Sequence, residues 1–394
     1  MAIIIDEATL VTPDRVLIAP LRILNAQVDQ IGGWLRPDQG DILLRLPGHF
    51  IFPGFINAHD HLECNLFPRL GNRTYSNAYE WGKETFSRQR EPVIDAILRV
   101  PMHKRLLWGG YKNLLSGVTT VAHHGIYVAR TLDRGFPVRV LRDYGWSHSL
   151  GLGENVRRAY LRTIPDHPFL IHLAEGVDDV VAKELRLLDM MGAMRSNTVV
   201  VHGLGLSNSD IALLSRRVSG LIWCPSSNLF LFGKTLDIGR VKRQIKVALG
   251  TDATMTGVPN MLSELRAATE IGALSAYEVL KMVTSSAAEI LRIAGLTGRM
   301  REGLAADLLV IRENAASSPH QRLLDINRED IRLVFRAGVP CFGDEDFQDL
   351  FEFCGVDFER IQVGDTDKLI VRGLNELVET VSDMLGGALP QRLI

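Results

Sequence analysis

The sequence predicts an α/β protein: a (β/α)₈ barrel of the TIM type joined to a small discontinuous β-sandwich domain. Apolar runs of β type alternate with longer segments of helical periodicity from Phe50 to about Gly298, which is typical of parallel βα units. Short apolar runs separated by Pro, Gly and Asp lie on both sides of this region, as in antiparallel sheets. We therefore expect residues 1–50 and 299–343 to form the β domain, 51–298 the barrel and 344–394 a helical extension.

The barrel strands are expected where a short apolar run ends in a polar or glycine-containing turn. Seven runs fit this description: Phe50–Ala58, Val118–His123, Val138–Trp146, Phe169–Ala174, Thr198–Val201, Leu221–Cys224 and Lys246–Gly250. A closed barrel needs eight strands, and the interval from Val138 to Ala174 is too short for two full βα units. One unit is therefore expected to be irregular or missing.

Helical periodicity fills the intervals between these runs and returns at the carboxyl terminus. The clearest segments are Val180–Met191, Asn260–Ile271 and an amphipathic stretch near Val371–Leu385. The strand pattern resumes in Leu308–Ile311 and Ile331–Ala337, which we expect to rejoin the amino-terminal segment.

The amino-acid composition limits the kinds of binding partner and the cellular compartment that we expect. The 394 residues are 46% hydrophobic and 23% charged with a net charge of −2, which argues against a nucleic-acid or anionic-membrane partner. We expect no signal peptide, because the first residues lack a basic segment followed by a long apolar core. No uncharged apolar run of about 18 residues is seen, so no membrane span is expected. The four cysteines lack CxxC spacing, which favours a reduced, cytoplasmic location.

Two histidines end the first predicted barrel strand. Side chains of a strand alternate between its faces, so His59 and His61 are expected to point the same way where the strand ends. Two adjacent imidazoles can hold one side of a borderline metal ion such as zinc. With eleven histidines in the chain, this pair alone is a weak signal.

Further residues of metal-binding or acid–base type follow later strands. His172 and Glu175 follow one apolar run, His202 another and Asp252 a third. Because the carboxyl ends of barrel strands converge on one pocket, three histidines and an aspartate could surround a divalent cation and leave a position open for water. Taken singly, His172 and Glu175 are better explained by core hydrogen bonding and helix capping. For Asp252 the alternative is a helix cap, which is weakened because the helical pattern resumes only at Asn260. For His202, orienting water or a carbonyl is favoured over a fifth ligand or plain packing.

A longer series of motifs carries a family resemblance. In order, these are Pro53–His61, Ser116–Thr120, His172–Glu175, Cys224–Leu229, Gly250–Asp252, Met261–Arg266 and Gly303–Val310. The series spans roughly residues 40 to 340 and resembles the amidohydrolase superfamily, in particular its cytosine-deaminase-like branch with the chlorohydrolases (ATZ/TRZ type) and guanine deaminases.

The resemblance implies a metal-dependent hydrolase. By it, His59, His61, His172 and Asp252 match the metal ligands, Glu175 the proton shuttle and His202 a second catalytic position, while Asp252 also orients the attacking water. Binuclear members of the superfamily bridge two metals with a carboxylated lysine, and no lysine lies between Lys112 and Lys183. One divalent ion is therefore expected, Zn²⁺ for preference and Fe²⁺ as the alternative.

The substrate pocket is less well defined by the sequence. The candidate substrate-binding residues are Trp81, His123, His124, His148 and Asn228. Cys64 and Cys224 are expected near the pocket, but neither has an evident base partner, so a thiol nucleophile is not expected.

Three readings of function follow. The favoured one is hydrolytic deamination of an aminated heterocycle; hydrolysis of a cyclic or linear amide, or of a ring halide, would use the same metal site. The third is a non-catalytic paralogue with a degraded pocket, which only the short middle of the barrel supports. The expected partner is a small-molecule substrate, and the resemblance together with the carboxyl-terminal helix suggests a homodimer.

Overall fold

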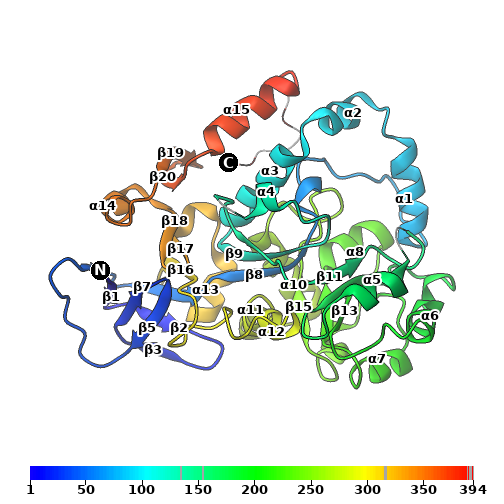
Figure 1. Cartoon of the computed structure of the whole chain (residues 1–394), viewed down its shortest axis with the longest axis horizontal. Helices are drawn as coiled ribbons and strands as arrows, with labels where there is room; N and C mark the ends of the chain where they lie inside the picture. Colours follow the sequence, from blue (N-terminus) through cyan, green and yellow to red (C-terminus); the bar gives the residue numbers. More distant parts are fainter. Residues whose placement is uncertain (134, 153–154, 315–316, 388, 390–392, 394) are drawn as a thin grey trace.

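Eight parallel strands form the barrel, divided between a three-stranded and a five-stranded sheet (Figure 1). The computed structural model describes residues 1–394 except 134, 153–154, 315–316, 388, 390–392 and 394. The sheet orders are β10-β9-β8 and β11-β12-β13-β14-β15. The strands are β8 (Phe55–Asp60), β9 (Val118–His123), β10 (Arg139–Val140), β11 (Gly145–Ser147), β12 (Phe169–Leu173), β13 (Thr198–His202), β14 (Gly220–Trp223) and β15 (Val247–Leu249). The predicted α/β barrel is confirmed.

Helices follow most of the barrel strands and cover the outside of the barrel. They are α1 (Ala78–Ser87), α2 (Pro92–Arg99), α3 (Met102–Leu114), α4 (Ala129–Leu132), α5 (Val156–Arg162), α6 (Glu184–Met190), α7 (Asn208–Leu214), α8 (Pro225–Phe232), α9 (Ile238–Val241), α10 (Met261–Gly272), α11 (Ala276–Met282) and α12 (Ser285–Ile290). The helix predicted over Asn260–Ile271 is α10, and Asn260 caps it by accepting a hydrogen bond from Ser263 N.

The irregular unit lies between β10 and β11. The single strand expected over Val138–Trp146 is wrong: residues 141–144 separate two short strands and contain no helix. β10 pairs with β9 whereas β11 pairs with β12, and no ladder joins β10 to β11 among the described residues. The run therefore breaks because its two halves pair with different neighbours, which periodicity within the run does not reveal.

A second predicted strand is also divided. Phe50–Ala58 separates at Gly54 into β7 (His49–Pro53), which pairs antiparallel with β16 of the β domain, and β8 of the barrel. A Cβ at Gly54 would lie 2.4 Å from Thr119 Cγ2, so the crossing between the two sheets requires glycine here. The first barrel strand consequently starts at Phe55 rather than at residue 51.

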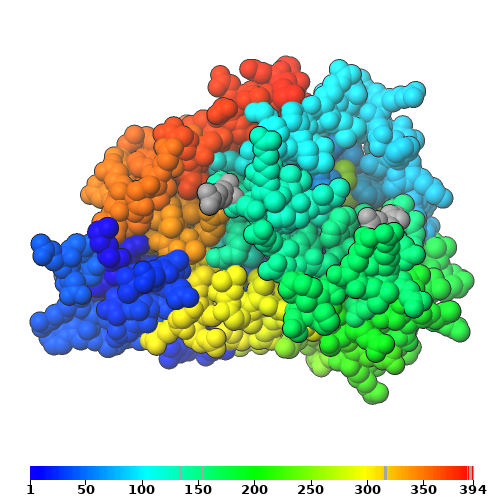
Figure 2. All heavy atoms as spheres, in the orientation of Figure 1, coloured from blue at the N-terminus to red at the C-terminus, as the bar shows by residue number. Residues whose placement is uncertain are grey.

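The β domain consists of two sheets built from both ends of the chain. Figure 2 shows the amino-terminal segment (blue) and the late segment (orange) as one continuous lobe. The eight-stranded sheet has the order β19-β20-β18-β17-β16-β7-β2-β3, and the four-stranded sheet has the order β5-β4-β1-β6. Its remaining strands are β1 (Ile3–Asp6), β2 (Thr9–Val11), β3 (Val16–Ile18), β4 (Leu21–Leu24), β5 (Gln27–Ile31), β6 (Ile42–Arg45), β16 (Leu308–Arg312), β17 (Ile331–Arg336), β18 (Val339–Asp344), β19 (Phe358–Val363) and β20 (Thr366–Val371).

The last fifty residues are not only helical, contrary to expectation. They contain the hairpin β19–β20, which extends the eight-stranded sheet through β18, in addition to α14 (Gln348–Phe353) and α15 (Leu374–Met384). Because β19 alternates buried and exposed residues only over its second half, it lacks a full period-two pattern. α15 buries Leu374, Leu377 and Val381 and packs on α3 (Figure 1). No helix among the described residues is long and apolar enough to cross a membrane.

The interior of the barrel is filled by aliphatic side chains, many of them small or β-branched. This core includes Ile56, Leu170, Val199, Val201 and Ala248, each fully buried. Their neighbours along the strands, such as Phe169 and Ile171, pack instead against the surrounding helices. The polar cluster described next lies beyond this core, at the carboxyl ends of the strands.

Candidate metal and active site

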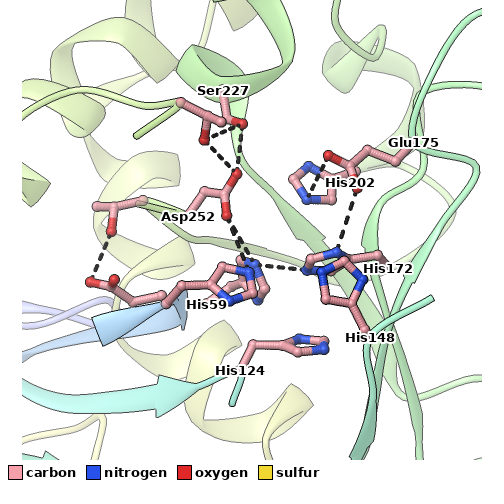
Figure 3. A network of polar contacts seen from close by, with 12 residues as sticks. His59, His124, His148, His172, Glu175, His202, Ser227 and Asp252 are labelled. Carbon is pink, nitrogen blue, oxygen red and sulfur yellow. Dashed lines mark hydrogen bonds and ion pairs between the residues drawn. The ribbon is translucent and has the colours of Figure 1, made fainter. Parts of the chain in front are cut away.

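Four predicted ligands converge at the carboxyl ends of β8, β12 and β15 (Figure 3). His172 Nε2 lies 3.1 Å from His59 Nε2. Asp252 Oδ1 lies 3.4 Å from His59 Nε2 and 3.5 Å from His61 Nε2. His59 Nε2 therefore lies within 3.5 Å of both His172 Nε2 and Asp252 Oδ1, and the same Asp252 oxygen also approaches His61.

This donor set fits a zinc ion. Zn–N distances are about 2.0–2.1 Å, so two ligands of a tetrahedral ion stand roughly 3.3–3.4 Å apart. The three measured separations, 3.1, 3.4 and 3.5 Å, bracket that value. His59, His61 and Asp252 also form one of the groups able to hold a metal ion, and His59 belongs with His172 and His202 to the other found among the described residues.

Unusual backbone geometry aims these side chains. Ala174, His202 and Asp252 adopt left-handed φ angles of 53°, 69° and 60°, a conformation that costs free energy in residues other than glycine. The β8–β9 ladder also changes register between Asn57 and Asp60. Each of these departures lies at or just after the end of a strand beside the cluster.

Burial sets the protonation of the ligands. It lowers the pKa of His59 to about 4, and together with neighbouring histidines it lowers the pKa of His172 well below its usual range. Burial alone would raise the pKa of Asp252, but His59, His202 and His61 lower it well below its usual value. Neutral imidazoles and an ionised carboxylate are the forms that bind metal.

Asp252 is held by residues that the sequence did not single out. Ser227 Oγ and Thr256 Oγ1 donate to Asp252 Oδ2 at 2.6 and 2.8 Å. These bonds leave Oδ1 facing His59 and His61. Ser227 lies within the recognised Cys224–Leu229 motif, whereas nothing in the local sequence marks Thr256.

Glu175 and His202 lie side by side next to the ligand cluster. Glu175 Oε1 is 3.6 Å from His202 Nε2, and Glu175 Oε2 is 3.5 Å from His172 Nδ1. Burial and the nearby Asp252 raise the pKa of Glu175 well above its ordinary value. Asn228 Oδ1 contacts His202 Nδ1 at 3.0 Å, which orients this imidazole with Nε2 toward Glu175.

A cavity of about 280 Å³ opens beside these residues. Its polar lining includes His61, His148, His172, Glu175 and Asp252. Its apolar lining includes Trp81, Phe86, Leu152, Leu231 and Met255. The cavity therefore offers a ligand both hydrogen-bonding groups and apolar surface.

The five candidate substrate-binding residues occupy different places. Trp81 and His148 line the cavity. His124 packs against His172 with ring centroids 4.4 Å apart but is not among the lining residues. His123 points toward Glu63, with Nδ1 3.8 Å from its Oε2, and Asn228 contacts His202. His123, His124 and Asn228 do not line this cavity, and their part in substrate binding stays a prediction.

The cysteines do not supply a nucleophile. Cys64 lines the cavity and Cys224 is buried. Burial raises the pKa of both thiols well above their ordinary value, so neither is a thiolate at neutral pH.

The chain is similar to known proteins in sequence and in fold. The profile of the Amidohydrolase family matches residues 146–340. A 5-methylthioadenosine/S-adenosylhomocysteine deaminase of Haloarcula marismortui is 31% identical over 334 residues, covering 69% of this chain and 75% of that protein. A deaminase of the same name from Thermococcus sibiricus is 25% identical over 390 residues, covering 82% and 87%. The crystal structure of an adenosine deaminase from Xanthomonas campestris with bound zinc superposes with a TM-score of 0.69 at 18% identity, covering 97% of each chain.

Proposed function

Because the chain belongs to the amidohydrolase family, we propose that it is a metal-dependent hydrolase that releases ammonia from an aminated heterocycle. The observation that carries the proposal is the convergence of His59, His61, His172 and Asp252 beside Glu175 and His202 (Figure 3). Deaminase relatives and a zinc-containing structural neighbour support the same chemistry.

The four ligand side chains would hold one divalent ion, for which zinc suits the donor set best. When bound, such an ion would lower the pKa of a coordinated water toward ~7, so that hydroxide is available at neutral pH. Asp252 is also proposed to orient the attacking water. Its Oδ2 is occupied by Ser227 and Thr256, so Oδ1 is the oxygen available to orient water.

Glu175 is the proposed proton carrier. It takes a proton from the attacking water and delivers it to the ring nitrogen or the departing amine. A buried carboxyl with a raised pKa retains a proton long enough to donate it. His202, whose Nδ1–H donates to Asn228 Oδ1, has Nε2 available to accept a hydrogen bond from the attacking water and so to orient it.

The cavity constrains the substrate class. At about 280 Å³ it is near the lower end of the ~300–1,000 Å³ usual for small-molecule pockets. The apolar surface formed by Trp81, Leu231 and Met255 favours an uncharged ring system with a short apolar substituent. We therefore propose a compact aminated heterocycle as the substrate.

Metal content of the purified protein tests the proposal first. We expect about one zinc per chain, which elemental analysis also distinguishes from iron, and loss of that zinc in His61→Ala. His123→Ala is the matched control, because His123 is buried nearby but faces Glu63. Two metals per chain would contradict the mononuclear site, and none after reconstitution would favour a non-catalytic protein.

Ammonia release from a panel of aminated purines, pyrimidines and nucleosides tests the reaction. The wild-type protein should release ammonia from at least one compound, and metal-depleted protein should not. Zinc-bound protein that instead hydrolyses cyclic amides or ring halides would replace deamination by one of those reactions.

A further inference from the structure

A buried polar network lies directly behind the proposed ligands. At its centre Asp60, which stands between His59 and His61 in the chain, accepts hydrogen bonds through both carboxylate oxygens. The donors to Oδ2 are Asn57 Nδ2 at 3.0 Å, Asn113 Nδ2 at 2.8 Å, Thr251 Oγ1 at 3.2 Å and Lys112 Nζ at 3.3 Å; Asn65 Nδ2 donates to Oδ1 at 2.6 Å. None of these residues is more than 2% exposed.

Lys112 is the unusual member of the network. Its ammonium group, carried on α3 and 2% exposed, also donates to Asn65 Oδ1 at 2.7 Å and to Thr251 Oγ1 at 3.3 Å. Burying a lysine is costly unless its charge is paired and its three protons are bonded. Here Asp60 pairs with the charge, and Asp60, Asn65 and Thr251 provide one acceptor for each of the three protons.

The network lies at the seam where the barrel closes. The first barrel strand, β8, and the last, β15, share no ladder among the described residues; an isolated bridge joins Asp60 to Asp252. Main-chain bonds at this seam run from Asp252 N to His59 O at 3.1 Å and from His61 N to Asp252 O at 2.8 Å. Because β8 and β15 pair so little, the distance between the His59–His61 segment and Asp252 also depends on side chains that connect the two strand ends.

Those connections come from the network. Thr251, which precedes Asp252, donates its N–H to Asn57 Oδ1 at 3.1 Å and its hydroxyl to Asp60. We infer that Lys112 and Asp60 are positioning residues: their buried ion pair holds the His59–His61 segment against the Thr251–Asp252 turn and so keeps the metal ligands assembled. The inference rests on the proposed metal site.

Zinc affinity of three variants tests the inference. Lys112→Met removes the charge and leaves Asp60 unpaired; Asp60→Asn with Lys112→Met removes both charges; Lys104→Met changes a half-buried lysine on the same helix. Affinity is measured by competition with a chromophoric chelator. The visible spectrum of the cobalt-substituted protein reports ligand geometry, and thermal unfolding of the metal-free protein reports folding.

We expect Lys112→Met to bind zinc 10–100-fold more weakly, the usual effect of removing a group that orients metal ligands, and to alter the cobalt spectrum. The double variant should fall between Lys112→Met and wild type, because no buried charge is left alone, and Lys104→Met should match wild type. If Lys112→Met does not fold, the inference is tested by the zinc affinity of the double variant, which should be lower than that of wild type. Wild-type affinity in the folded Lys112→Met or double variant would overturn the inference alone, whereas wild-type protein that binds no zinc would overturn the proposed function as well.

Discussion

Replacing Glu175 by glutamine should remove proton transfer and leave the metal site intact. Glutamine has the same shape and nearly the same volume, so packing around this buried side chain is preserved. Its amide cannot accept and return a proton. Since a positioned acid–base group contributes about 10²- to 10⁴-fold to rate, turnover should fall by that factor, or roughly 2.7–5.4 kcal/mol in activation free energy.

A shorter acidic side chain at residue 175 distinguishes the loss of the carboxyl group from a change in its position. Glu175→Asp keeps the carboxyl but withdraws it by about one carbon–carbon bond, ~1.5 Å. Its separations from His172 Nδ1 and His202 Nε2, now 3.5 and 3.6 Å, would increase further, which takes the carboxyl group away from both imidazoles. We expect a loss of at least tenfold in turnover, with the substrate KM changed less than kcat.

The assay is ammonia release on the best substrate of the panel, with zinc content measured on the same samples. Both variants should retain about one zinc per chain, because Glu175 is not in the proposed ligand set. Turnover by Glu175→Gln above one-tenth of wild type would refute the proton-carrier role. Loss of zinc from Glu175→Gln would instead show that Glu175 is a ligand.

Four further predictions concern the site and its support. Zinc at one hundred times its dissociation constant should stabilise the protein by about 2.7 kcal/mol, seen as a higher Tm that a chelator reverses. Asn228→Ala, which removes the contact that orients His202, should lower kcat by roughly tenfold, the worth of one hydrogen bond, with zinc content unchanged. Burial raises the pKa of Glu264 from 4.5 to about 7, so the free energy of unfolding should decrease as pH rises between these values. Urea unfolding of metal-free Glu264→Gln should therefore show a gain over wild type that grows between pH 4.5 and 8 to at most roughly 3 kcal/mol. A difference that does not change with pH would contradict this. Gly54→Ala, whose Cβ would lie 2.4 Å from Thr119 Cγ2, should destabilise the protein by about 1–3 kcal/mol in the same assay. Adding Thr119→Ser should restore only part of this stability, because the hydroxyl oxygen at residue 119 would still lie 2.5 Å from the new Cβ.

Several features of the fold were not accessible to sequence patterns. β7 and β8 form one apolar run, yet they belong to different sheets, and the run over Val138–Trp146 divides in the same way. In both cases each half is a good strand by itself. What divides it is the choice of pairing partner, a property of distant segments that leaves no local periodicity.

The sequence by itself determined the barrel and the donor types at its strand ends, because both are written in local patterns: alternating βα periodicity, and histidine or carboxylate side chains directly after apolar runs. Tertiary structure alone decided how those donors are held. Ser227 and Thr256 fix one oxygen of Asp252, and Lys112 reaches Asp60 across 52 residues of chain. Such contacts form between buried polar groups that must find partners wherever the fold brings them together, so they depend on the closed barrel and not on sequence spacing.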